Sequence, residues 1–114
     1  MNKNKFRIYS EIEVKRREFD AKIYFATKVA HQGFSVVIGK KSAMFDNRRN
    51  FQKGLYLKKS LGPNHIKQIK EFKKLGFIVG AIDEEGLMMT SEKEYCESRF
   101  SHNLELVDIF FCWG

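Results

Sequence analysis

The amino-acid sequence predicts an α/β fold, namely a doubly wound, mostly parallel sheet with helices on both faces. Short apolar runs typical of buried strands alternate with longer segments whose apolar residues recur at helical spacing. Glycines follow the two clearest helical segments, at Gly33 and Gly76, where helices commonly end. The expected order of elements is β-α-β-(β)-α-β-α-β, which is the order of a Rossmann-like layer.

The first third of the chain predicts a β-α-β unit. Residues 6–14 alternate between apolar and polar side chains, with Tyr9 as an exception, which indicates a strand with one apolar face. Residues 19–31 carry an apolar stripe at helical spacing, and residues 34–39 form a β-branched run. A strand, a helix and a strand in this order imply a parallel pair joined by a right-handed crossover.

The rest of the chain continues this alternation. Residues 39–51 are polar and basic, and although Gly39 follows a strand, neither glycine-rich phosphate-binding motif is present. Pro63 suits the first turn of a helix over 64–75. The remaining expected elements are strands over 54–57, 77–82 and 108–114 and a helix over 92–100.

Composition bounds the class of protein. The 114 residues suffice for one domain, and 43% hydrophobic and 14% aromatic residues favour a packed core over disorder. The net charge of +7 is compatible with nucleic acid, an anionic membrane surface, an acidic small substrate, or a lysine-rich solvated surface. The two cysteines and three histidines are scattered, so we expect no metal site.

Two features bear on cellular location. No apolar run approaches the roughly 20 residues of a membrane-spanning helix, and the basic N-terminus is not followed by the apolar core of a signal peptide. We therefore expect a cytoplasmic chain. The basic helix over 64–75 is compatible with a peripheral position at the inner face of the cell membrane, although a solvated helix face explains it as well.

Three consecutive carboxylates, Asp83, Glu84 and Glu85, follow the apolar run over 77–82 and precede Gly86. Ligands of open α/β sheets bind just outside the carboxyl ends of the strands, so these acids stand where chemistry is expected. Mutual repulsion would raise the pKa of at least one of them if they share a site. A solvated loop that starts the next element is the alternative.

The last apolar run, over 108–114, is the most apolar of the chain, and no further helical segment follows it. Because parallel sheets are normally covered on both faces, we expect residues 1–114 to be a single N-terminal domain of a longer protein. An edge strand covered by earlier helices is the alternative.

Four stretches resemble one protein family. Residues 17–22 (REFDAK), 33–39 (GFSVVIG), 83–87 (DEEGL) and 110–114 (FFCWG) are similar, in this order, to the N-terminal domain of the bacterial surface carbohydrate biosynthesis proteins. Those proteins are presumed glycosyltransferases with two Rossmann-like domains, the GT-B arrangement. The resemblance implies an acceptor-side domain without a cofactor of its own, and a nucleotide-sugar donor bound by a C-terminal domain.

A second similarity bears on mechanism. Glu84-Glu85-Gly86 is similar to the acidic-acidic-glycine motif of bacterial GT-B sialyltransferases, in which the first acid is the general base for the acceptor hydroxyl. The similarity implies Glu84 as the base and Glu85 as its neighbour. Asp83 adds a third acid, and neighbouring acids move the pKa of a base towards a useful value.

A group of charges begins the first helix. Arg16, Arg17 and Lys22 would place positive charge near the carboxyl end of the first strand, where it could hold a carboxylate or phosphate of the acceptor. Glu18 and Asp20 could pair with these cations or accept hydrogen bonds from acceptor hydroxyls. Ordinary charge at a helix N-terminus is the alternative.

These expectations combine into one function and two alternatives. The function is acceptor binding in bacterial surface polysaccharide biosynthesis, with a saccharide or lipid-linked saccharide as the partner. The alternatives are a non-catalytic remnant that only binds partners, and a basic nucleic-acid-binding module, which the absence of a recognised binding motif disfavours. Without a donor-binding domain, we expect the isolated chain to be inactive.

Overall fold

The computed structural model describes residues 6–13, 15–82 and 106–111, and they form a parallel sheet flanked by helices. The strand order is β2-β1-β3-β4-β5, and every neighbouring pair is parallel. The predicted α/β fold class is therefore confirmed. The strands are β1 (Arg7–Ile12), β2 (Ser35–Lys40), β3 (Leu55–Lys58), β4 (Ile78–Ile82) and β5 (Ile109–Phe111).

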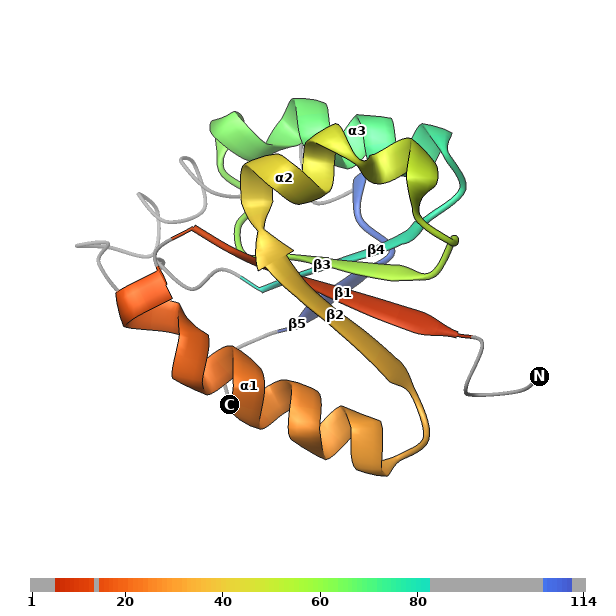
Figure 1. The fold of residues 1–114 in the computed structure, drawn as a ribbon. Coiled ribbons are helices and arrows are strands. Elements are labelled where there is room, and N and C mark those ends of the chain that lie inside the picture. The colour runs from red at the N-terminus through yellow and green to blue at the C-terminus, as the bar shows by residue number, and fades with distance from the viewer. Residues whose placement is uncertain (1–5, 14, 83–105, 112–114) are drawn as a thin grey trace.

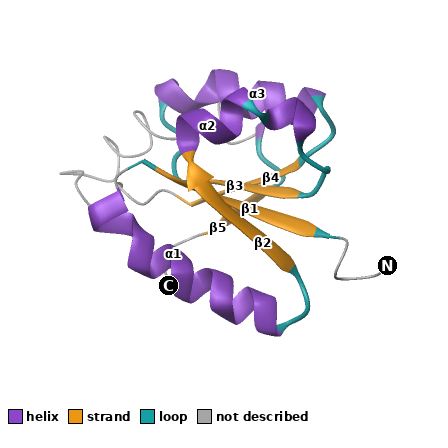
Figure 2. Cartoon of the chain, in the orientation of Figure 1, coloured by secondary structure: helices purple, strands orange, loops and turns teal. Residues whose placement is uncertain are grey.

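Helices cover both faces of this sheet, as a doubly wound fold requires. Helix α1 (Lys15–His31) lies on one face, whereas α2 (Lys41–Asp46) and α3 (Ile66–Lys74) lie together on the other (Figures 1 and 2). Short 3-10 turns, η2 (Arg48–Asn50) and η3 (Pro63–His65), follow α2 and precede α3. After β2 the chain crosses to the other face of the sheet, so that β3 pairs with β1. The connection that follows β1 leads away from β3 to β2, and the connection that follows β3 leads away from β1 to β4.

The polar stretch over 39–51 is not an open loop, because it contains α2 and η2. Six residues are too few to show a helical period in a basic sequence, and isolated helices of that length are not stable. Tertiary packing stabilises α2, because Met44 is buried in the core and Phe45 packs against the core. Helix α1 begins at Lys15, within the group of charged residues predicted to start it, and Glu18 lies in its first turn.

Strand β1 is buried on both faces, whereas its alternating pattern predicted one apolar face. Ile8 and Ile12 lie on the face towards α1, while Tyr9 and Glu11 lie under α2 and α3. A central strand of a parallel sheet has helices on both sides. Glu11 is therefore buried despite its charge, with 1% of its surface exposed.

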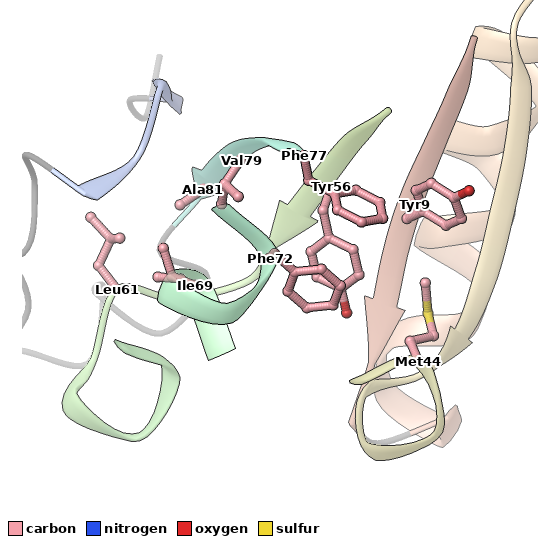
Figure 3. Close-up of a cluster of buried hydrophobic side chains, with 9 residues drawn as sticks. All are labelled: Tyr9, Met44, Tyr56, Leu61, Ile69, Phe72, Phe77, Val79 and Ala81. Carbon is pink, nitrogen blue, oxygen red and sulfur yellow. The ribbon is translucent and has the colours of Figure 1, made fainter. Parts of the chain in front are cut away.

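Stacked aromatic rings form the core between the sheet and α3 (Figure 3). The rings of Tyr56 and Phe72 stack with centroids 3.8 Å apart, and Phe77 meets Phe72 edge to face. Tyr9 stacks on Tyr56 from the neighbouring strand. Beyond α3, Gly76 adopts a φ of 93°, a conformation that glycine favours, so the predicted helix end at this glycine is confirmed.

Strand β5 pairs with β4 and ends the order of the described strands. Ile109 and Phe111 are 41% and 43% exposed. Asp108 anchors the strand, because its carboxylate accepts hydrogen bonds from the Val79 N–H at 2.9 Å and from Lys73 at 2.7 Å. No helix in the described part of the chain combines the length and apolar character needed to cross a membrane.

Candidate functional site at the switch point of the sheet

The carboxyl ends of β1 and β3 form the point at which the strand order reverses, and ligands of open α/β sheets bind at such points. Acidic and basic side chains that are far apart in the sequence meet there. We call these residues the switch-point cluster: Glu11, Glu13, Glu18, Lys41, Lys58, Lys59 and His65.

Glu11 is the centre of this cluster. Its Oε1 accepts hydrogen bonds from the Tyr56 hydroxyl at 2.8 Å and from Lys58 Nζ at 2.9 Å. Its Oε2 accepts a bond from the backbone N–H of Lys59 at 3.3 Å. Burial, together with the charge of Glu11, raises the pKa of Tyr56, so this hydroxyl stays protonated and donates. The Glu11 carboxylate is thus held from three directions.

Lys58, the last residue of β3, and Lys59, which follows it, point to opposite faces of the sheet. Lys58 faces α3, where its ammonium group also donates to Gln68 Oε1 at 2.7 Å. Lys59 faces α1, where Nζ lies 3.0 Å from Glu18 Oε2. This divergence follows from the alternation of side chains along an extended strand. Burial lowers the pKa of Lys58, and the neighbouring Glu11 carboxylate opposes that shift.

Glu13 and Lys41 form the part of the cluster that solvent can reach. Their side chains are 33% and 18% exposed, and Lys41 Nζ lies 3.0 Å from Glu13 Oε1. Partial burial opposes ionisation, but the hydrogen bond and charge of Lys41 prevail and lower the pKa of Glu13. Glu13 is therefore ionised near neutral pH. It offers acceptor oxygens at the surface of the cluster.

His65 links the buried and exposed carboxylates. Nδ1 lies 3.8 Å from Glu11 Oε2, and Nε2 lies 3.7 Å from Glu13 Oε1. The side chain is 8% exposed, and the buried Nδ1 has no hydrogen-bond partner. Burial and the nearby Lys58 and Lys41 lower the pKa of His65 to about 3, so its imidazole is neutral near pH 7. Among the described residues, no three His, Cys, Asp or Glu side chains are arranged to hold a metal ion.

Of the five residues predicted at the start of the first helix, Glu18 joins the switch-point cluster. It is buried, and it pairs with Lys59. Lys22 lines a groove between α1 and the sheet. Arg16 and Asp20 are exposed on α1, and the side chain of Arg17 lies outside the described part of the chain. The predicted acids Asp83, Glu84 and Glu85 also lie outside the described residues, which reach Ile82 at the end of β4.

Glu11, Lys58, Lys59 and His65 were not predicted from the sequence. A signal was present for the lysines, because both follow the apolar residues of a short strand and so stand at its carboxyl end. No comparable signal marks Glu11, which has the alternating position of a solvent-facing strand residue. It lies 47 residues from Lys58 in the sequence.

The charges of the switch-point cluster sum to zero, because it contains three glutamates, three lysines and a neutral histidine. The buried pairs hold the strand ends rigidly, while Glu13 and Lys41 present an acceptor and a donor to solvent. Such a surface suits a small polar ligand with several hydroxyl groups. Comparisons of the chain with protein-family models, with curated protein sequences and with solved structures found no match.

Proposed function

We propose that this chain is the acceptor-binding domain of a glycosyltransferase-like protein of bacterial surface polysaccharide biosynthesis. The observation that carries the proposal is the switch-point cluster, a preorganised set of donors and acceptors at the place where α/β sheets bind ligands. A saccharide presents hydroxyl groups that both donate and accept hydrogen bonds. Glu13 would accept from one such hydroxyl, and Lys41 would donate to a neighbouring oxygen.

The rest of the proposed mechanism follows from the sequence resemblance. Glu84 would act as the general base for the acceptor hydroxyl, and a nucleotide sugar would be bound by a C-terminal domain. In this role the domain works in the cytoplasm, at the inner face of the cell membrane. The buried pairs, Glu11 with Lys58 and Glu18 with Lys59, would position the strand ends rather than contact the acceptor.

Saturation-transfer NMR of the chain with glucose, N-acetylglucosamine and N-acetylneuraminic acid tests the proposal. We expect transfer to at least one of these sugars, and we expect Glu13→Gln to weaken that sugar's binding by about tenfold, since a charge-assisted hydrogen bond is lost. Glu71→Gln is the matched control. Glu71 is a half-buried glutamate of α3 that pairs with Arg48 of η2, away from the switch point. Absence of transfer to all three sugars, or equal losses in the two variants, would contradict the proposal.

A further inference from the structure

The outer side of α3 carries positive charge that the described acids do not balance. Lys67, Lys70 and Lys74 lie along one stripe of the helix, since residues three and four apart are neighbours on a helix surface. Lys67 and Lys70 are exposed and form no ion pair within the described part of the chain, and the Lys74 side chain is 77% exposed. We call these three residues, together with Lys53, the lysine face.

Lys53 extends this face beyond the C-terminal end of the helix. Its Nζ lies 3.2 Å from the position that a Cβ atom at Gly76 would occupy, and Gly76 follows the last turn of α3. Lys53 is exposed and, like Lys67, has no ion pair among the described residues. Positive charge therefore spans the length of the helix, roughly 14 Å at the usual rise per residue.

One described carboxylate lies beside the lysine face, and it is already paired. Glu71 is the only acid of α3, and its Oε2 lies 3.5 Å from Nη2 of Arg48 in the adjacent η2. Its Oε1 lies 3.8 Å from Lys74 Nζ. The exposed residues Asp46 and Arg49, on α2 and η2, carry opposite charges and leave this balance unchanged. Four lysines and Arg48 thus share a single carboxylate, so the face is strongly cationic.

The chemistry of the lysine face favours a lipid surface over nucleic acid. Ile69 and Phe72, on the inner side of α3, are fully buried, and among the described residues the exposed large apolar side chains lie on α1, β4 and β5. The face therefore presents no aromatic ring on which bases could stack, as single-stranded nucleic acid commonly requires. Nor does α3 contain arginine, whose planar fork suits the recognition of individual phosphates. Lysine ammonium groups are hydrated point charges, which suit a diffuse layer of lipid phosphates.

We propose that the lysine face docks this chain on an anionic phospholipid surface, with α3 parallel to the membrane and no side chain of the helix inserted among the acyl chains. The inference has its physical basis in the charges of α3 and rests on the proposed function for its biological meaning, since a lipid-linked acceptor is held at a membrane. His65 of the switch-point cluster immediately precedes α3 (Figure 1). A chain docked through α3 would therefore hold the candidate site close to the lipid headgroups.

Co-sedimentation of the chain with phosphatidylcholine vesicles, with and without phosphatidylglycerol as about one third of the lipid, tests this inference. We expect binding only to the vesicles that contain phosphatidylglycerol. We also expect that binding to be lost at about 0.5 M salt, because exposed charges are then screened within a few ångströms.

Matched variants localise the docking surface. Lys70→Glu and Lys28→Glu change the net charge of the chain equally, but Lys28 is exposed on α1, on the opposite face of the sheet. Each lysine near an anionic surface raises the affinity about fivefold, so we expect Lys70→Glu to weaken vesicle binding by about 25-fold and Lys28→Glu by less than about twofold. The double variant Lys67→Gln/Lys70→Gln removes two charges without adding repulsion, and its loss should match that of Lys70→Glu.

Three results would overturn the inference: no binding to anionic vesicles at low salt, equal losses in Lys70→Glu and Lys28→Glu, or tighter binding to DNA than to vesicles that Lys70→Glu abolishes. The last would assign the lysine face to nucleic acid. Saccharide binding at Glu13 is measured without vesicles, so a chain that binds sugars but not anionic vesicles contradicts the docking surface alone. A chain that binds anionic vesicles but no sugar contradicts the proposed function alone.

Discussion

At the scale of single residues, the Glu11–Lys58 ion pair links the carboxyl ends of β1 and β3. Both side chains are fully buried. The Glu11 carboxylate accepts hydrogen bonds from the Tyr56 hydroxyl, the Lys59 backbone N–H and the Lys58 ammonium group, and Lys58 also donates to Gln68. Desolvating two charges is costly, and good geometry with further hydrogen bonds offsets that cost. The pair therefore gives the strand ends a defined position more than it adds net stability.

The variant Lys58→Met tests this view of the pair. It leaves the Glu11 carboxylate buried without its cation, so we expect the free energy of unfolding to fall by about 3–5 kcal/mol. The double variant Glu11→Gln/Lys58→Met removes both charges, and its loss should be smaller than that of Lys58→Met alone. Urea denaturation followed by circular dichroism measures both. A double variant that loses more stability than Lys58→Met alone would contradict a coupled pair.

At the scale of elements, the close approach of β1 and β3 builds the switch point. Gly54 comes immediately before β3, and a Cβ atom there would collide with the backbone carbonyl oxygen of Arg7 at the start of β1. Backbone cannot rotate away as a side chain can. The two strands meet in register, with Tyr9 opposite Tyr56 and Ser10 opposite Leu57. A glycine at this position is thus required by packing.

We expect Gly54→Ala to lower the free energy of unfolding by about 1–3 kcal/mol, since one strand must shift. Gly39→Ala is the matched control, because a Cβ there would meet the flexible side chain of Met44, whose Cγ and Sδ lie 2.9 Å away. The control should lose less stability than Gly54→Ala. Thermal unfolding of both variants measures these losses. An equal loss of stability in the two variants would show that the close approach of the strands at Gly54 does not cause the destabilisation.

At the scale of the whole molecule, stability depends on pH through groups whose pKa changes on folding. The pKa of His65 is about 3 in the folded chain and near 6.5 in an unfolded one. Between these values the unfolded state binds more protons, so the free energy of unfolding rises with pH. The contribution of His65 is complete above pH 6.5 and is lost as the pH falls towards 3. Glu13 and Asp108, whose pKa values are lowered, also lose stabilisation as the pH falls, but only below about pH 4.5.

Unfolding measurements from pH 7.5 to 5.0 therefore test the role of His65. We expect the chain to lose stability below pH 6.5 by up to about 1.4 kcal/mol per pH unit. His65→Gln should flatten this dependence, whereas the same substitution at the exposed His31 should keep the parent slope. A parent chain whose stability is constant from pH 7.5 to 5.0 would show that His65 is not a buried neutral imidazole.

The amino-acid sequence by itself determined the fold class, most of the strands and the ends of α1 and α3, because periodicity and glycine conformation are local properties. Tertiary structure alone decided that residues 41–46 form a helix and that β5 pairs with β4. It also decided the candidate site. Strands β1 and β3 become neighbours only when the chain changes faces after β2, and this long-range pairing brings Glu11 to Lys58 and His65. A local sequence pattern does not show that these side chains lie close together, because their desolvation and pairing depend on residues far away in the chain.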